Sequence, residues 1–120
     1  MAKPFVLIVE DDPKLSDIFS VSLQSVGFDT EMIADGKVAI SRLTEIVPTI
    51  VLLDLNLPGA SGQEVLKNIR ADERLDKTRV ILATADAGLA DMIRHEADFV
   101  LLKPISPLQL RELASRLRGA

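Results

Sequence analysis

The sequence contains no cysteine, and this absence excludes a fold held together by disulfide bonds. It also lacks an apolar run of the roughly 20 residues that a membrane-spanning helix needs. The N-terminal stretch MAKPFVLIVEDD reaches acidic residues too early to contain the apolar segment of a signal peptide. These three absences predict a cytoplasmic protein without a membrane partner.

Basic side chains are also scarce, because 14 lysines and arginines stand against 18 aspartates and glutamates, which gives a formal net charge of −4. They are scattered along the chain, whereas nucleic-acid-binding domains usually gather them into a basic patch. We therefore expect no direct binding of DNA or RNA. Apolar side chains make up 48% of the 120 residues, enough for one hydrophobic core, so residues 1–120 are expected to form one domain.

Five short apolar runs alternate with stretches that carry helix signals. Three of them are almost unbroken and rich in valine, isoleucine and leucine, which is typical of parallel strands covered on both faces, and the second is more polar, as an edge strand is. The expected strands are FVLIV (5–9), FDTEMI (28–33), TIVLL (49–53), VILA (80–83) and FVLL (99–102). This alternation predicts an α/β fold, a doubly wound five-stranded parallel sheet with flanking helices.

The first helix has a clear start and a clear end. Asp12 and Pro13 supply an N-cap and a proline at the first helical position, and Gly27 stands where a helix stops. These signals predict a helix over 13–26, with Ile18 on its apolar face.

Other helices have similar signals. One is expected to begin at Asp35-Gly36 and to be closed by Pro48. The stretches Ser61 to Glu64 and Ser106 to Gln109 have the spacing of capping boxes, so each predicts a helix start.

Right-handed crossovers bring the C-terminal ends of parallel strands to one edge of the sheet, and ligands bind outside that edge. Polar side chains follow four of the five expected strands. They are Glu10 and Asp11 after the first, Asp54 after the third, Thr84 after the fourth and Lys103 after the fifth. This edge of the sheet is therefore predicted to contain the functional site.

The segments around these residues resemble four motifs of one family, the receiver domains of two-component response regulators. LIVEDDP is similar to the first acidic motif of the family, VLLDLNLPGASG to its phosphoacceptor motif, ILATA to its hydroxyl motif and VLLKPIS to its lysine-proline motif. One such match alone would be weak, but all four occur in order at the expected strand ends. The resemblance covers about Lys3 to Arg118 and implies a flavodoxin-like sheet with strand order 2-1-3-4-5.

The resemblance implies chemical roles for these residues. Asp54 would be the phosphoacceptor, whose carboxylate takes a phosphoryl group from a phosphohistidine on a histidine kinase or phosphotransfer protein. A magnesium ion held by Asp11, Asp54 and the backbone carbonyl of Asn56 would neutralise the phosphoryl oxygens, with Glu10 acting through water.

The resemblance also implies which groups donate hydrogen bonds to the transferred phosphoryl group. They would be the hydroxyl of Thr84, the ammonium of Lys103 and the backbone N–H of Ala85, and the bond between Lys103 and Pro104 would be cis. Such a domain is not an enzyme in the ordinary sense, because it promotes only its own phosphorylation and dephosphorylation. It would act as a monomer or weak dimer on a downstream protein or output domain that the sequence does not name.

Some polar residues need no functional role, and two alternative functions compete for the whole chain. Asp12 is accounted for by its N-cap position, and His95 by an exposed place on a helix. A receiver-like interaction module that is never phosphorylated would be expected to lose Asp54, Asp11 or Lys103, and this chain keeps all three. A haloacid-dehalogenase-like phosphatase would need an acid two residues after its nucleophile, where this sequence has Asn56.

Two departures from the family pattern affect the segment that reports phosphorylation. Receivers usually carry tyrosine or phenylalanine three residues before the lysine, but this chain has Val100, and the neighbouring Phe99 should point to the opposite face. Thr84 and Lys103 are only 19 positions apart (103 minus 84), about one helical turn fewer than in the best-known chemotaxis member of the family. With Gly88 inside it, the fourth helix is expected to be short or partly unwound.

Overall fold

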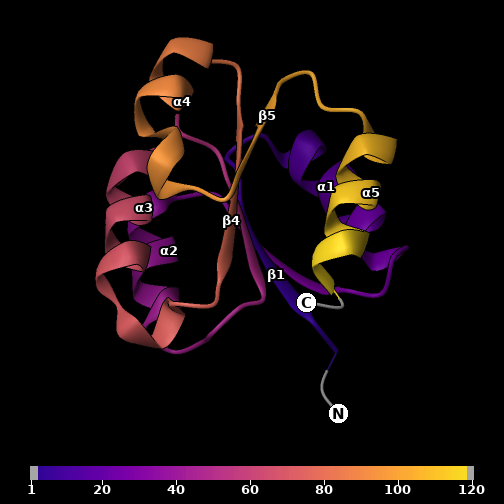
Figure 1. Cartoon of the computed structure of the whole chain (residues 1–120), viewed down its shortest axis with the longest axis horizontal. Helices are drawn as coiled ribbons and strands as arrows, with labels where there is room; N and C mark the ends of the chain where they lie inside the picture. Colours follow the sequence, from indigo (N-terminus) through magenta and orange to yellow (C-terminus); the bar gives the residue numbers. More distant parts are fainter. Residues whose placement is uncertain (1–2, 119–120) are drawn as a thin grey trace.

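A computed structural model describes residues 3–118 and contains one parallel sheet between two layers of helices (Figure 1). The ends of the expected domain, residues 1–2 and 119–120, lie outside the described residues. The strands are β1 (Phe5–Val9), β2 (Asp29–Ile33), β3 (Ile50–Leu53), β4 (Arg79–Thr84) and β5 (Phe99–Leu102). The helices are α1 (Pro13–Gln24), α2 (Gly36–Leu43), α3 (Gly62–Ala71), α4 (Ala87–Ile93) and α5 (Pro107–Arg118), with 3-10 turns η1 (Glu73–Leu75) and η2 (Arg94–Glu96).

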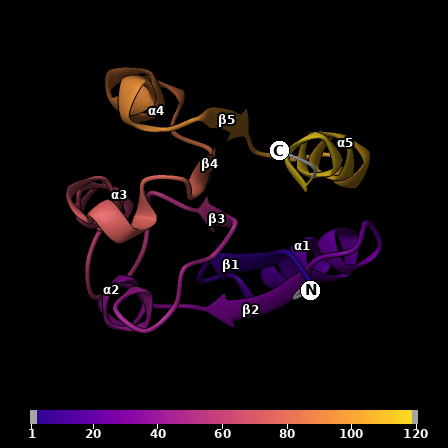
Figure 2. The same cartoon turned by 60° about the horizontal axis from the view of Figure 1, so that its bottom comes forward.

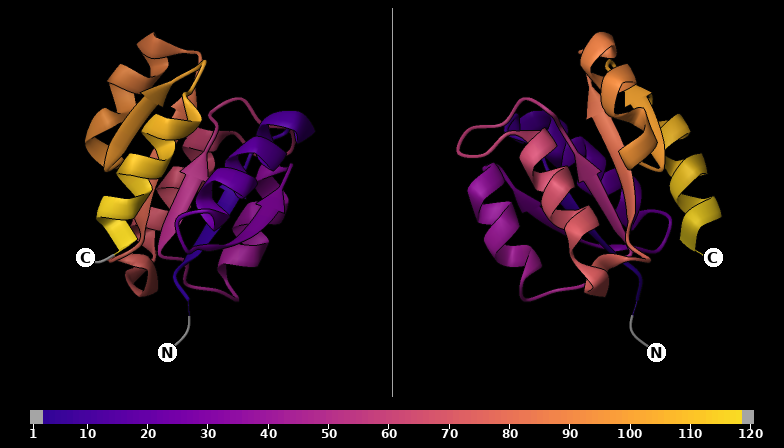
Figure 3. Two further views of the ribbon diagram at one scale, coloured as in Figure 1. Left: turned by 90° about the vertical axis from the view of Figure 1, so that its right-hand side faces the viewer. Right: turned by 60° about the vertical axis from the view of Figure 1, so that its left-hand side comes forward.

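The strand order is β2-β1-β3-β4-β5, and every pair of neighbours is parallel, so the expected fold is confirmed. Helices α1 and α5 cover one face of the sheet, and α2, α3 and α4 cover the other (Figures 2 and 3). Alternate residues of β1 point to opposite faces of the sheet. Val6 and Ile8 pack towards α1 and α5, and Leu7 and Val9 pack towards α2 and α3. All four are fully buried, which explains why the sequence run has no polar position.

The apolar face of α1 differs from the expected one. Ile18 is 46% exposed, so its assignment to the buried face is wrong. The buried side chains include Ser16, Phe19, Ser20 and Leu23, which recur at helical spacing although two of them are polar. Ser20 can be buried because its hydroxyl forms a 2.6 Å hydrogen bond with that of Thr30 on β2.

The helix signals are confirmed at most other positions. Gly27 has a φ of +93°, a left-handed conformation that favours glycine, although α1 already ends at Gln24. Ser61 and Ser106 accept the N–H groups expected of N-caps. The assignment of Pro48 as the residue that closes α2 is wrong, because this helix ends at Leu43, where Thr44 folds back onto the Ser41 carbonyl.

The start of α3 is pressed against the segment that follows β3. The N–H of Gly62 donates to the carbonyl of Leu55 at 3.0 Å, and a Cβ at this glycine would overlap backbone atoms of Asp54 and Leu55. We expect Gly62→Ala to lower the free energy of unfolding by roughly 2–3 kcal/mol, because the added methyl group would meet backbone atoms, which cannot give way as a flexible side chain can. Equilibrium unfolding in urea measures this change.

Gly88→Ala is the matched control for the Gly62 variant. A Cβ at Gly88 would meet only Asp86 Oδ1 at 3.7 Å, an ordinary contact. Alanine also favours a helix over glycine by about 1 kcal/mol, so this variant should be neutral or slightly more stable. Equal losses in the two variants would contradict the steric explanation.

Candidate functional site

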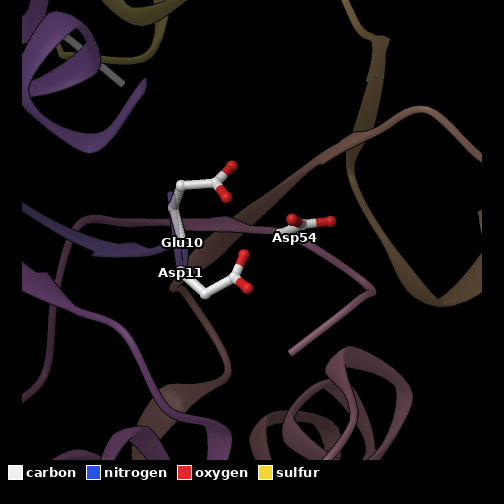
Figure 4. A group of neighbouring side chains, drawn as sticks. All are labelled: Glu10, Asp11 and Asp54. Atoms are coloured by element: carbon white, nitrogen blue, oxygen red, sulfur yellow. The ribbon is translucent and has the colours of Figure 1, made fainter. Parts of the chain in front are cut away.

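Three carboxylates meet at the C-terminal edge of the sheet (Figure 4). Glu10 and Asp11 directly follow β1, and Asp54 directly follows β3. The backbone N–H of Asp54 donates to the Val9 carbonyl at 3.0 Å. One oxygen from each carboxylate lies within 4.8 Å of the others. Glu10 and Asp54 are 3% and 5% exposed, while Asp11 is open to solvent. The parallel register therefore brings Asp54 to the other two acids although it follows Asp11 by 43 positions (54 minus 11).

A lysine from the far end of the chain neutralises part of this charge. Lys103 follows β5, and its Nζ donates to Glu10 Oε1 at 2.6 Å and to Asp54 Oδ2 at 3.1 Å. Its peptide bond to Pro104 is cis, as the resemblance implied. Partial burial acts to lower the pKa of Lys103, but its bonds to Glu10 and Asp54 outweigh burial and raise it, so the ammonium stays charged.

Burial raises the pKa of Glu10, and the bonds from Lys103 and from the Asp12 N–H offset this only in part. Because the folded-state pKa of Glu10 lies above its ordinary value of 4.5, its contribution to stability is fully present below pH 4.5 and is lost as the pH rises through the folded-state value. At neutral pH its burial therefore opposes folding. Such a cost at a cleft is typical of a functional site.

The site contains more negative than positive charge. Four acidic residues and one lysine line a cleft of about 580 Å³, to which Asn56 also contributes; they are Glu10, Asp11, Asp12, Asp54 and Lys103. A hard divalent cation such as Mg²⁺ prefers oxygen ligands of this kind, one or two carboxylates being its usual share. The donor set therefore fits a magnesium ion, with Asp11 as the acid most open to solvent.

A second cleft, of about 290 Å³, adjoins the same carboxylate of Asp54. Thr84 and Ala85 line it together with Lys103 and Asn56. Thr84 is 2% exposed, and its Oγ1 accepts the N–H of Asp86 at 3.1 Å, which leaves the hydroxyl hydrogen free to donate. The structure thus brings every residue predicted for the site to one edge of the sheet.

Asp12 and His95, for which the sequence predicts no functional role, lie at an N-cap and on an exposed turn, respectively. The side chain of Asp12 accepts the N–H groups of Lys14 and Leu15 and caps α1. His95 is exposed in η2 beside Glu96. Asp86 was not singled out from the sequence, although an aspartate directly before a helical segment is the ordinary signal of an N-cap.

The strand order and the acids at the edge where it reverses define a flavodoxin-like α/β domain with an acidic cleft. A family model for the response regulator receiver domain matches residues 6–115. The chain therefore belongs to the family of response regulator receiver domains of two-component systems. Receiver domains are regulatory phosphoacceptor domains rather than classical enzymes.

Known proteins similar to this chain agree with the family. The DNA-binding response regulator MtrA of Mycolicibacterium smegmatis is 36% identical over 117 residues, which cover 95% of this chain but 49% of MtrA. The receiver domain of the sensor histidine kinase PA1611 of Pseudomonas aeruginosa, solved with a magnesium ion coordinated in its active-site cleft, is 27% identical with a TM-score of 0.88 over 99% of this chain and 100% of that one. A CheY-like receiver domain of Methylobacillus flagellatus is 26% identical with a TM-score of 0.86 over 97% and 99% of the two chains.

The chain spans about half the length of the curated relatives it matches, such as MtrA at 49%. Within residues 3–118, no helix combines the length and the apolar character needed to cross a membrane.

Proposed function

We propose that Asp54 accepts a phosphoryl group from the phosphohistidine of a histidine kinase or phosphotransfer protein. The observation that carries this proposal is the environment of its carboxylate. Oδ2 receives a hydrogen bond from Lys103, Oδ1 receives one from the Asn56 N–H, and the other two acids lie within 4.8 Å. A nucleophilic carboxylate held in this way is oriented before the donor arrives.

Magnesium is the cofactor in this proposal. Asp11, Asp54 and the backbone carbonyl of Asn56 would hold the ion, which supplies positive charge to the phosphoryl oxygens. Glu10 would act through water, because its Oε1 is already bonded to Lys103 at 2.6 Å. The magnesium ion in the cleft of the Pseudomonas receiver domain supports this assignment.

The remaining donors act on the phosphoryl group directly. The ammonium of Lys103 and the hydroxyl of Thr84, with the N–H of Ala85, would stabilise the charge that spreads over its oxygens during transfer. All three line the same cleft as Asp54.

The change is then passed to a partner protein or to an output domain outside this chain. MtrA, a relative about twice as long, is a DNA-binding regulator. The net charge of −4 on this chain argues against nucleic-acid binding by the receiver domain itself. We place the domain in the cytoplasm, as a monomer or weak dimer and as a single unit over residues 1–120.

Intact-mass spectrometry after incubation with acetyl phosphate tests the proposal. We expect the parent protein to gain one phosphate when magnesium is present and none when a chelator removes it. Asp54→Asn should gain none under either condition, because the amide is a poor nucleophile that still accepts the Asn56 N–H. A gain without metal, or in Asp54→Asn, would refute the assignment, and no gain at all would favour an interaction module that is not phosphorylated.

A further inference from the structure

We propose that Asp86 is a positioning residue that connects the Thr84 hydroxyl to the first turn of α4, so that a shift of Thr84 towards the phosphoryl group reorders this helix. This inference rests on the proposed function of Asp54. It also assigns to Asp86 a role that depends on its hydrogen bonds rather than on its charge.

Asp86 is bonded to both of the elements that it would connect. Its N–H donates to Thr84 Oγ1 at 3.1 Å, on the side of the phosphorylation site. Its carboxylate accepts the N–H of Leu89 at 2.9 Å, and its carbonyl accepts the N–H of Ala90 at 3.0 Å. A displacement of Thr84 therefore cannot leave the start of α4 unchanged unless the bond between Thr84 and Asp86 breaks.

The hydroxyl of Thr84 can serve both partners at once. A hydroxyl has one donor hydrogen and two acceptor lone pairs, and the Asp86 N–H uses only one lone pair. Its hydrogen therefore remains available to a phosphoryl oxygen on Asp54, in the cleft that both residues line. The same atom would bind the phosphoryl group on one side and hold the loop of α4 on the other.

Helix α4 is weak enough to respond to a change at one residue. Among its seven residues, all of them described, Ala90 is the one that is buried. Leu89 and Ile93 pack only partly against the core. Because a two-turn helix has little stability of its own, the cap from Asp86 is a large share of what holds its first turn.

The other end of this segment is tied to α3 and to the sheet. Arg70 on α3 donates to the Glu96 carbonyl at 2.6 Å and to the carboxylate of Asp98 at 2.8 Å. Asp98 also accepts the N–H of Val80 on β4 at 2.8 Å. A shift that enters at Asp86 is therefore absorbed between Ala87 and Glu96, before it reaches β5.

A carboxylate in this cleft could instead act by repelling the phosphoryl group, since Asp86 also lines it. Asparagine separates these two roles, because it caps helices about as well as aspartate but has no charge. Asp86→Asn should therefore behave like the parent protein, and Asp86→Ala should not. Asp91→Ala is the matched control, because it removes an exposed carboxylate of α4 that pairs with Arg94 at 3.6 Å and leaves the N-cap in place.

Amide hydrogen exchange of the unphosphorylated proteins is the first measurement. We expect Asp86→Ala to speed exchange of residues 89–93 by about 2- to 30-fold, the range that the loss of one N-cap gives. Thr84→Val should free the Asp86 N–H and speed its exchange, and Thr84→Ser should restore protection. Unchanged exchange in both Asp86→Ala and Thr84→Val would overturn the connection, whatever happens at Asp54.

The second measurement compares exchange at equal phosphorylated fractions, fixed by intact mass. The parent, Asp86→Asn and Asp91→Ala should all change their exchange over residues 89–93 on phosphorylation, and Asp86→Ala should lose most of this response. An undiminished response in Asp86→Ala, or a loss of the response in Asp86→Asn, would overturn the proposal. If the parent takes up no phosphate, the function proposed for Asp54 fails instead, and the first measurement still decides the connection.

Discussion

Lys103→Ala is expected to lower the free energy of unfolding of the metal-free protein by roughly 2–4 kcal/mol. Within residues 3–118, the ammonium is the one cation bonded to Glu10 and Asp54, whose side chains are only 2% and 6% exposed. Without it, both carboxylates remain buried with no counter-charge, and Asp11 adds a third negative charge within 4.8 Å. The fold should survive this loss, because the lysine contributes to the site and not to the apolar core.

Magnesium should restore much of the stability that Lys103→Ala removes. An ion that binds only the folded protein stabilises it in proportion to its affinity, and the variant offers the ion carboxylates with no competing ammonium. Urea unfolding with a chelator and with saturating magnesium measures both effects. Phosphorylation of the variant should also produce a weaker structural change, because the bond proposed between Lys103 and the phosphoryl group would no longer connect that group to β5.

Lys3→Ala is the control for the effect of losing a lysine. Lys3 forms an exposed pair with Asp29 at 3.9 Å, and exposed pairs contribute less than about 1 kcal/mol. If Lys103→Ala costs no more than Lys3→Ala, or if magnesium leaves the variant as unstable as before, the charge argument is wrong.

The sheet could be predicted from the sequence because its three central strands, β1, β3 and β4, are buried on both faces. The predicted runs 5–9 and 99–102 agree with the strands at both ends, and the other three runs differ by one residue at most at either end. A strand in this setting has no polar position, so the pattern does not depend on a distant partner. The site edge followed from the same fact, since parallel strands must end together.

The buried face of α1 could not be predicted in the same way. Ser16 and Ser20 occupy core positions because Thr30 and the sheet supply hydrogen-bonding partners and close packing, while Ile18 and Val21 are exposed. Which side of a helix is buried depends here on a neighbour that local apolar spacing does not reveal.

The hydrogen-bonding partner of Glu10 also could not be predicted from the sequence. The resemblance implies that Glu10 acts on the metal ion through water, yet its direct partner in the structure is the ammonium of Lys103, 93 positions away. The motifs identify both residues, but the choice between a water, an ion and an ammonium depends on distances of a few ångströms. The roles proposed for both residues stay predictions.

The short fourth helix, by contrast, was correctly predicted from length alone. Helix α4 has seven residues and continues as the 3-10 turn η2, as the 19 positions between Thr84 and Lys103 required. Phe99 packs on the α5 side of the sheet and Val100 on the α4 side, so the phenylalanine cannot take the place of the missing ring.

We expect magnesium with beryllium fluoride, a mimic of the phosphoryl group, to change amide exchange most in residues 85–96 and little in α5. An aromatic ring at position 100 could turn inward and fill space beside the hydroxyl residue, but the small, stiff side chain of Val100 cannot change shape in this way. Helix α5 is firmly held, because it buries Leu110, Leu113, Ala114 and Leu117.

The structural change must therefore arise in the segment with the least packing. Residues 85–96 contain a seven-residue helix with Gly88 inside it and a 3-10 turn without a buried residue in this described stretch. Segments of this kind open at low free energy, so a shift of Thr84 can change their population without moving the core. Asp54→Asn, exposed to the same reagents, gives the background. If exchange slows mainly around Val100 and α5 while residues 85–96 stay unchanged, this explanation is wrong. The structural change would then pass through the sheet edge and α5, although position 100 carries a valine and not an aromatic ring.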